Sequence, residues 1–172
     1  MLGIQEFMDF SEIYEEHFDR IYAYICCRIG LDGIAEDLAA QVFQKALARS
    51  GQYDPARGNI AQWLFGIARN EINYHLRLSA LRHFVPLDLF SEALAAKEKP
   101  VIDGLSEQQE KTELMAALAT LNARERDLIT LKFYSEMNNR EIAKLSGLSE
   151  SNVGTILSRT MEKLRQIFAE VG

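Results

Sequence analysis

The sequence predicts an all-α protein with two small domains, an N-terminal helix bundle and a C-terminal helix-turn-helix domain, joined by a flexible linker. Apolar residues recur at spacings of three and four along most of the 172 residues, which is the period of an amphipathic helix. We find no stretch that alternates apolar and polar residues as a half-buried strand would. Residues 85–105 carry two prolines and no sustained periodicity, so they are the expected linker between residues 1–84 and 106–172.

The N-terminal domain contains three predicted helices. The first covers residues 7–29 and carries an apolar stripe on one face. The second covers residues 34–48 and has acids in its first turn, where they suit the positive end of the helix dipole. Gly, Asp and Pro mark residues 50–58 as a loop, after which Asn59 is expected to cap a third helix over residues 60 to about 82. Together these helices would form one compact bundle.

The C-terminal domain begins with two predicted helices before its helix-turn-helix. The first covers residues 106–121, and we expect Leu114, Leu118 and Leu121 to face inward. The second covers residues 123–134.

The helix-turn-helix is predicted from a turn signal between two short apolar repeats. Gly147 follows Ala143 by four residues, where the chain must leave a helix, and glycine permits the positive φ that such a turn requires. Ser149 is a good N-cap for the next helix. That helix normally enters the DNA major groove. Its inward face comprises Val153, Leu157, Thr160 and Leu164.

Composition and residue spacing argue against several other classes of protein. The chain has no apolar run near the roughly 20 residues that span a bilayer, and its N-terminus lacks the features of a signal peptide. Cys26 and Cys27 are neighbours in an apolar helical stretch, so we expect reduced core thiols in a cytoplasmic protein. His17, His75 and His83 show no metal-ligand spacing. With no phosphate loop or catalytic triad signature either, we expect neither a metal, a cofactor nor catalysis.

The net charge of −6 is unusual for a protein that binds DNA. Residues 113–172 carry eight basic and eight acidic side chains, whereas residues 83–112 carry three and six. Part of the negative charge therefore lies away from the helix-turn-helix. No segment is strongly basic, so non-specific DNA binding by the isolated chain should be weak.

Three parts of the chain together indicate a family, and the third of them consists of two segments. Residues 35–47 read A-E-D-L-A-A-Q-V-F-Q-K-A-L, and residues 60–77 read I-A-Q-W-L-F-G-I-A-R-N-E-I-N-Y-H-L-R. Residues 121–134 read L-N-A-R-E-R-D-L-I-T-L-K-F-Y, and residues 140–153 read R-E-I-A-K-L-S-G-L-S-E-S-N-V. In this order they resemble the core-polymerase-binding helix, the promoter −10 and melting segment, and the −35-reading domain of extracytoplasmic-function sigma factors. These are the two-domain members of the bacterial sigma-70 family.

The resemblance implies an alternative sigma factor of the bacterial cytoplasm. Residues 1–84 would be sigma region 2 and residues 106–172 sigma region 4. Such a protein binds core RNA polymerase, at the β′ clamp helices and the β flap, and directs it to promoter DNA. It makes no bonds itself, because the chemistry belongs to the polymerase. The resemblance also implies control by an anti-sigma factor.

The candidate polymerase-docking surface is the polar face of the second helix. Composition alone favours an ordinary solvated face, and the motif match reverses that preference for Asp37 and Gln41. The chain departs from the family here, since Ala40-Gln41 replaces a Gln-Glu pair. The candidate docking residues are Glu36, Asp37, Leu38, Gln41, Gln44 and Lys45.

The candidate −10 residues lie in or after the loop at 50–58 and along the third helix. Asn and Arg side chains suit exposed base edges and phosphates. By resemblance, the loop and Asn70 would hold a base flipped out of the −10 element. We expect Trp63, on the same helix, to be a core residue. The candidates are Arg57, Asn59, Arg69, Asn70, Asn73 and Arg77.

The candidate −35 residues are short polar side chains around one arginine on the recognition helix. Arg159 is the leading candidate for a base or phosphate contact, against the alternative of a solvated arginine near a helix end. Arg140 is a candidate phosphate contact. Gly154 and Ile156 stand where the family often has Lys or Arg, and Gly154 costs about 1 kcal/mol of helix stability. The full set is Arg140, Ser149, Ser151, Asn152, Thr155, Ser158, Arg159 and Lys163.

Two alternative functions remain open from the sequence. A sigma-like decoy would titrate an anti-sigma factor without reading DNA, and the acidity, Gly154 and the Ala40-Gln41 departure favour it slightly. An ordinary helix-turn-helix regulator would dimerise on a palindrome, and the N-terminal motifs argue against it.

Overall fold

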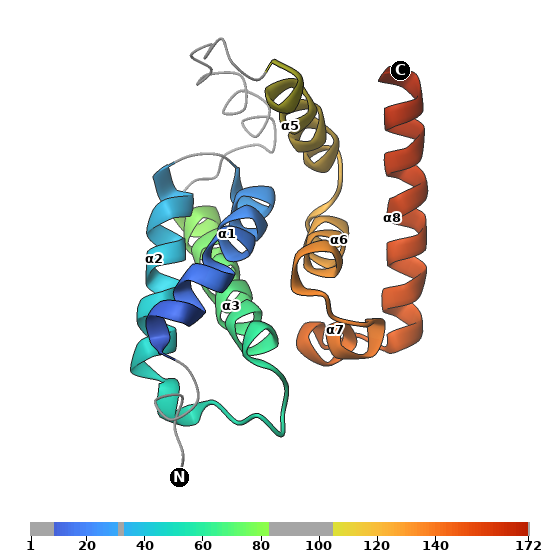
Figure 1. Cartoon of the computed structure of the whole chain (residues 1–172). Coiled ribbons are helices and arrows are strands. Elements are labelled where there is room, and N and C mark those ends of the chain that lie inside the picture. The colour runs from blue at the N-terminus through green and yellow to red at the C-terminus, as the bar shows by residue number, and fades with distance from the viewer. Residues whose placement is uncertain (1–8, 31–32, 83–104, 172) are drawn as a thin grey trace.

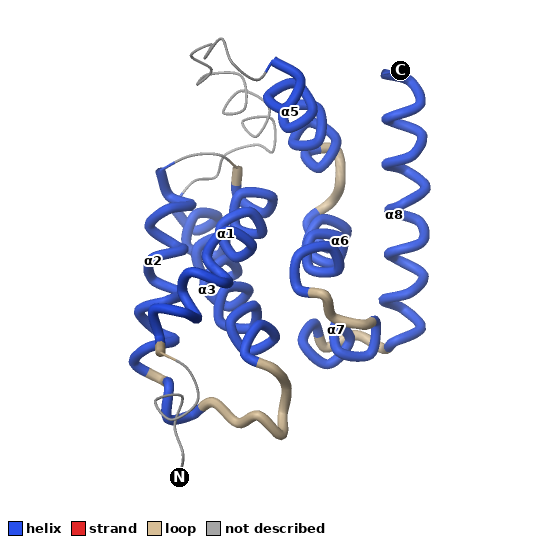
Figure 2. The backbone as a smooth tube through the Cα atoms, viewed as in Figure 1, coloured by secondary structure: helices blue, strands red, loops and turns tan. Residues whose placement is uncertain are grey.

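The computed structural model describes residues 9–30, 33–82 and 105–171, and helices dominate these ranges (Figure 1). Turns and loops account for the remaining residues of these ranges, and no strand occurs in the part of the chain described (Figure 2). The N-terminal half contains α1 (Phe10–Ile29), α2 (Gly33–Ala48), the short 3₁₀ turn η2 (Ser50–Gln52) and α3 (Ile60–Arg82). The C-terminal half contains α5 (Leu105–Ala119), α6 (Ala123–Ser135), α7 (Asn139–Ser146) and α8 (Glu150–Val171). The all-α prediction is confirmed.

Residues at the helix ends explain where α1 begins and stops and where α3 begins. Asp9 caps α1 by accepting a hydrogen bond from the amide of Ser11, while Gly30 ends it at a φ of 99°. At the start of α3, the Asn59 side chain accepts from the Gln62 amide at 2.9 Å, and the Gln62 side chain accepts from the Asn59 amide at 3.1 Å. The predicted Asn59 cap is therefore confirmed. The residues before Asp9, where the predicted first helix would begin, lie outside the described ranges.

The predicted helix-turn-helix is formed by α7 and α8. Gly147 adopts a φ of 74°, and its amide donates to the carbonyl of Ala143. Ser149 accepts a hydrogen bond from the amide of Asn152 at 3.2 Å, as expected for an N-cap. The four residues predicted to face inward on α8 are all buried: Val153, Leu157, Thr160 and Leu164.

One of the three predictions of inward-facing leucines in this region is wrong. Leu118 and Leu121 are buried, but Leu114 is 37% exposed, and Met115 and Ala117 are buried in its place. The helix ends at Ala119, so Leu121 lies beyond it. The spacing of Leu114, Leu118 and Leu121 is therefore not a repeat within one helix, and it could not identify the buried face of α5.

The two halves of the molecule pack directly against each other. Helix α6 contacts α1 and α3 on one side and α8 on the other, so it lies between the N-terminal bundle and the last helix (Figure 1). Buried apolar residues of both halves form a single hydrophobic cluster. Nearly all of the predicted linker, residues 85–105, lies outside the described ranges; its last residue begins α5.

Two predictions of core positions in the N-terminal bundle have different outcomes. Cys26 and Cys27 are buried free thiols, as predicted. Trp63, expected to be a core residue, is only half-buried: it packs against the hydrophobic cluster, and its ring centroid lies 5.5 Å from that of Tyr53.

Candidate nucleic-acid interface

The outer face of α2 presents most of the predicted docking residues to solvent. Glu36, Asp37, Gln41 and Gln44 are exposed. Leu38 is different, because it is 5% exposed and part of the hydrophobic cluster. Its apolar side chain supports the bundle and is not available to a partner, so we remove it from the candidate docking surface. Lys45 is half-buried and forms an ion pair with the buried Glu71 of α3, which fixes its ammonium group against the bundle.

An aromatic groove borders this face of α2. Tyr14 and Phe18 of α1 pack on Phe43 of α2, with the Tyr14 and Phe43 ring centroids 4.8 Å apart. A depression of about 550 Å³ lies over these rings, and Glu36 and Gln44 are also part of its lining. The sequence predicted that the apolar stripe of α1 packs into the bundle. It did not predict that part of this stripe forms a groove directly beside the polar face of α2.

The predicted −10 residues fall into an exposed group and an engaged group. Arg57, Asn70 and Arg77 are exposed. Asn59 is exposed too, but its side chain is engaged in capping α3. The loop that carries Arg57 borders a hollow of about 1140 Å³, whose other walls include Trp63 and residues of α7.

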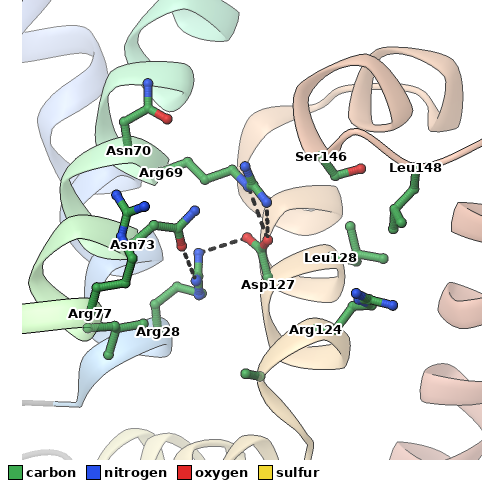
Figure 3. A pocket seen from close by; sticks show the side chains of 12 residues that line it. Arg28, Arg69, Asn70, Asn73, Arg77, Arg124, Asp127, Leu128, Ser146 and Leu148 are labelled. Carbon is green, nitrogen blue, oxygen red and sulfur yellow. Dashed lines mark hydrogen bonds and ion pairs between the residues drawn. The ribbon is translucent and has the colours of Figure 1, made fainter. Parts of the chain in front are cut away.

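Arg69 and Asn73, the remaining −10 candidates, take part in a polar network between the two halves (Figure 3). Arg69 donates two hydrogen bonds to Oδ2 of Asp127 on α6, at 3.0 and 2.9 Å, and a third to the carbonyl of Leu145. Arg28 of α1 donates to Oδ1 of Asp127 at 2.7 Å and to Oδ1 of Asn73 at 3.0 Å. In this arrangement Arg69 and Asn73 are occupied by the protein's own groups.

The ion pair at the centre of this network is buried. The side chains of Arg28 and Asp127 are 5% and 10% exposed, and the Tyr24 hydroxyl lies within hydrogen-bond distance of both. Removing one partner of a buried pair typically costs about 3–5 kcal/mol, because the other charge stays buried without compensation. Sequence reasoning named neither residue as functional, since nothing in the sequence shows that positions 28 and 127 meet.

The fold gathers positive charge that is dispersed in the sequence. A pocket of about 600 Å³ between α3 and α6 is lined by Arg28, Arg69, Arg77 and Arg124, with Asp127 the only acid among its described lining residues (Figure 3). Arg77 and Arg124 are exposed. This acidic protein therefore contains a concentrated basic region, which is the electrostatic property expected of a nucleic-acid interface.

The outer face of α8 agrees with the predicted helical phase. All of its candidates are exposed: Ser149, Ser151, Asn152, Thr155, Ser158, Arg159 and Lys163. Arg140, at the start of α7, is exposed as well. Neither Arg140 nor Arg159 forms a side-chain hydrogen bond or ion pair with another described residue. Both guanidinium groups are therefore accessible to an external ligand.

Lys163 differs from the other α8 candidates because it pairs with Glu125 of α6. This hydrogen bond, with a smaller contribution from the amide of Asn122, lowers the pKa of Glu125 below its ordinary value. The pair joins α6 to α8, so Lys163 has a structural partner already.

The described parts of the chain lack two further kinds of feature. No helix there is long and apolar enough to cross a membrane. No group of three or more His, Cys, Asp or Glu side chains there could hold a metal ion.

Two family matches cover much of the chain. The Sigma-70 region 2 family matches residues 13–81, and the Sigma-70, region 4 family matches residues 111–164. The first match contains α2 and nearly all of α1 and α3, and the second contains α6, α7 and most of α8.

Curated relatives align with almost the whole chain. It is 31% identical to the ECF RNA polymerase sigma factor RpoE of Cereibacter sphaeroides, over 91% of this chain and 84% of that protein. It is 28% identical to the ECF RNA polymerase sigma factor BldN of Streptomyces coelicolor, over 94% of this chain but only 61% of the relative. The ECF RNA polymerase sigma factor SigM of Bacillus subtilis is 23% identical, over 94% and 96%.

Two solved structures share the fold. The sigma factor RpoE of Bartonella quintana, in complex with the anti-sigma factor NepR, superposes with a TM-score of 0.74 at 21% identity, covering 94% of this chain and 97% of that one. CnrH, in complex with the cytosolic domain of CnrY, gives a TM-score of 0.67 at 18% identity, covering 95% and 89%.

Proposed function

The chain belongs to the extracytoplasmic-function sigma factors of the sigma-70 family, and from this premise we propose which of its surfaces bind RNA polymerase and promoter DNA. It is an alternative sigma factor. The polymerase makes the phosphodiester bonds, and this chain positions the enzyme at a promoter. We place its action in the bacterial cytoplasm, where the polymerase works.

The first proposed surface binds core polymerase at the β′ clamp helices. It is the outer face of α2, where Glu36, Asp37, Gln41 and Gln44 are exposed beside the aromatic groove. Polar side chains around an apolar depression give the combination of a polar rim and a desolvated centre that is usual in protein interfaces. An anti-sigma factor would compete for this surface, and region 4 would contact the β flap.

The second and third proposed surfaces bind promoter DNA. Residues of α3 and the preceding loop would contact the −10 element: Arg57, Asn59, Arg69, Asn70, Asn73 and Arg77. The exposed face of α7 and α8 would contact the −35 element: Arg140, Ser149, Ser151, Asn152, Thr155, Ser158, Arg159 and Lys163. We propose residues 1–84 and 106–172 as the two functional regions and 85–105 as their linker.

The observation that carries this proposal is the helix-turn-helix with an exposed polar face, in the same chain as a second face rich in Arg and Asn on α3. A sigma factor requires both faces, because it reads two promoter elements at once. Neither a decoy nor a dimeric regulator requires the second face.

In vitro transcription tests the proposal. The purified chain is added to core RNA polymerase with genomic DNA of its host, and transcript 5′ ends are mapped by sequencing. We expect new start sites that share a −10 and a −35 motif and are absent without the chain. Complex formation with core polymerase without new start sites would contradict the proposal and support the decoy. Tight palindrome binding by the free chain would support the regulator.

A further inference from the structure

The basic pocket between α3 and α6 contains a carboxylate supplied by the opposite half of the chain. We propose that this pocket binds phosphodiester groups of single-stranded promoter DNA and that, in the free protein, Asp127 fills it in place of a phosphate. The inference rests on the proposed role of α3 in −10 recognition and deepens it, because it makes α6 an internal competitor of the DNA.

Hydrogen-bond geometry supports the comparison of Asp127 with a phosphate. Arg69 uses Nε and Nη2 together on Oδ2, at 3.0 and 2.9 Å, while Arg28 approaches Oδ1 at 2.7 Å. The planar guanidinium fork has donors that match carboxylate and phosphate oxygens alike. The two arginines that hold Asp127 are therefore equipped to hold a phosphate.

The same contacts make the two occupants mutually exclusive. With α6 in place, Arg69 is also bound to the carbonyl of Leu145, and Asn73 accepts a hydrogen bond from Arg28. A DNA strand on this part of α3 would have to displace α6. Arg77 of α3 is exposed at the same pocket and stays in place when α6 leaves, so it would contact a neighbouring phosphate.

An internal competitor reduces the apparent DNA affinity of the free chain. The measured dissociation constant equals the intrinsic constant divided by the fraction of molecules whose pocket is open. Weakening the hold of Asp127 should therefore tighten DNA binding without adding any contact. Polymerase could achieve the same result by holding the two halves apart.

Substitution of Asp127 tests this directly. Mixed-sequence, fluorescent single-stranded DNA is titrated with the free full-length chain, and binding is followed by fluorescence anisotropy. Asp127→Asn should bind at least about tenfold more tightly than the wild type. If two more phosphates are contacted, the slope of log K against log salt should steepen by about 1.4, at about 0.7 per phosphate.

The control variant also removes one negative charge, but at a position outside the pocket. Glu162 is exposed on α8 and pairs only with α8 neighbours in the described structure. Glu162→Gln should stay within about twofold of the wild type, as expected for one distant surface charge. Circular dichroism establishes that each variant is folded. A folded Asp127→Asn that matches Glu162→Gln in affinity and salt slope would overturn the inference.

A second measurement uses the wild-type interface and needs no substitution at Asp127. Cys27 is buried beside α6, with its Sγ 3.6 Å from the Tyr134 hydroxyl. In a Cys26→Ala protein, DNA that displaces α6 should raise the rate of Cys27 modification by a thiol reagent at least about tenfold. DNA binding that leaves this rate unchanged would also overturn the inference, even if the Asp127→Asn variant does not fold.

Transcription separates failure of the inference from failure of the proposed function. If wild-type holoenzyme starts at promoters while both DNA-binding measurements fail, only the internal competitor is wrong. If the wild type never directs initiation, the sigma-factor surfaces are wrong, and the phosphate-binding results then lose their promoter context.

Discussion

At the scale of single residues, His17 combines deep burial with missing hydrogen bonds. It is 4% exposed, and neither ring nitrogen has a hydrogen-bond partner in the described structure. Burial lowers its pKa, opposed by the nearby carboxylates of Glu16 and Glu136 and assisted by Arg20. The neutral imidazole is therefore the form that the folded protein favours.

We predict that His17 makes folding stability depend on pH. Its folded pKa lies below the unfolded value of about 6.5, so the unfolded chain binds the proton more readily. The free energy of unfolding should fall as pH drops below this value, by at most about 1.4 kcal/mol per pH unit from this residue. Urea unfolding at pH 7.5 and 5.0 measures the effect. His17→Leu should show a smaller difference between the two pH values, and an unchanged difference would contradict the prediction.

Arg159 is the residue on which −35 recognition is expected to depend most. It is exposed on α8 and has no recorded partner in the described structure. Loss of a good base contact costs about 1–3 kcal/mol. Arg159→Ala should therefore reduce promoter-specific initiation by about 5- to 150-fold, with core polymerase affinity unchanged. Arg165→Ala is the control, since Arg165 is exposed on the same helix and outside the proposed surface. Equal transcription by both variants would remove Arg159 from the −35 surface.

At the scale of helices, α2 packs into the bundle with one face and presents the proposed docking surface on the other. Ala35, Leu38 and Val42 are buried, whereas Asp37 and Gln41 face solvent. We predict that Asp37→Arg leaves the fold intact and weakens core polymerase binding at least about tenfold, because reversing an interface charge costs several kcal/mol. Affinity is measured with labelled polymerase. Glu170→Arg, the same charge reversal at the exposed end of α8, should bind like the wild type; a similar loss in both variants would contradict the assignment.

Helix ends show how far local sequence determines this fold. The Asn59 cap, the Gly147 turn and the phase of α8 were predictable, because each depends on residues within a few positions of one another. Two reciprocal caps were missed, at Asn122 with Glu125 and at Asn138 with Glu141. Their Asn-x-x-Glu spacing, directly before a helix, was an available signal.

The candidate site was predictable only in part. Exposure of the candidates on α2 and α8 follows from helical periodicity, and the DNA-binding and docking roles proposed for them remain predictions. Burial of Leu38 follows from the same periodicity, because Ala35, Leu38 and Val42 share the buried face of α2. Engagement of Arg69 depends on α6, whose position no local pattern reveals. The basic pocket was missed for the same reason, since its arginines come from three helices.

At the scale of the whole molecule, the two halves should stay associated when the chain between them is cut. A protease is expected to cut first in residues 85–105, given their prolines and lack of apolar periodicity. The contacts of α6 with α1 and α3, with the buried pair of Arg28 and Asp127, do not depend on that connection. The nicked fragments should therefore co-elute on gel filtration.

Asp127→Asn tests whether the buried pair holds the nicked protein together. Its fragments should separate more readily, since Arg28 would lose its charged partner. The nicked Glu162→Gln protein should co-elute like the wild type. Folded wild-type fragments that elute apart at the same concentration would show that the interface is too weak to hold the free chain closed.

The Arg28–Asp127 pair also constrains how this protein can evolve. Its two residues lie 99 positions apart, in segments that match different sigma regions, so neither half can be exchanged alone without consequence. A chimera that joins this N-terminal half to a C-terminal half without the acid would inherit a buried arginine that lacks its charged partner. Substitutions at the two positions should therefore be epistatic: the loss of one residue makes the loss of the other less harmful. A library that varies positions 28 and 127 together should recover paired replacements more often than single ones.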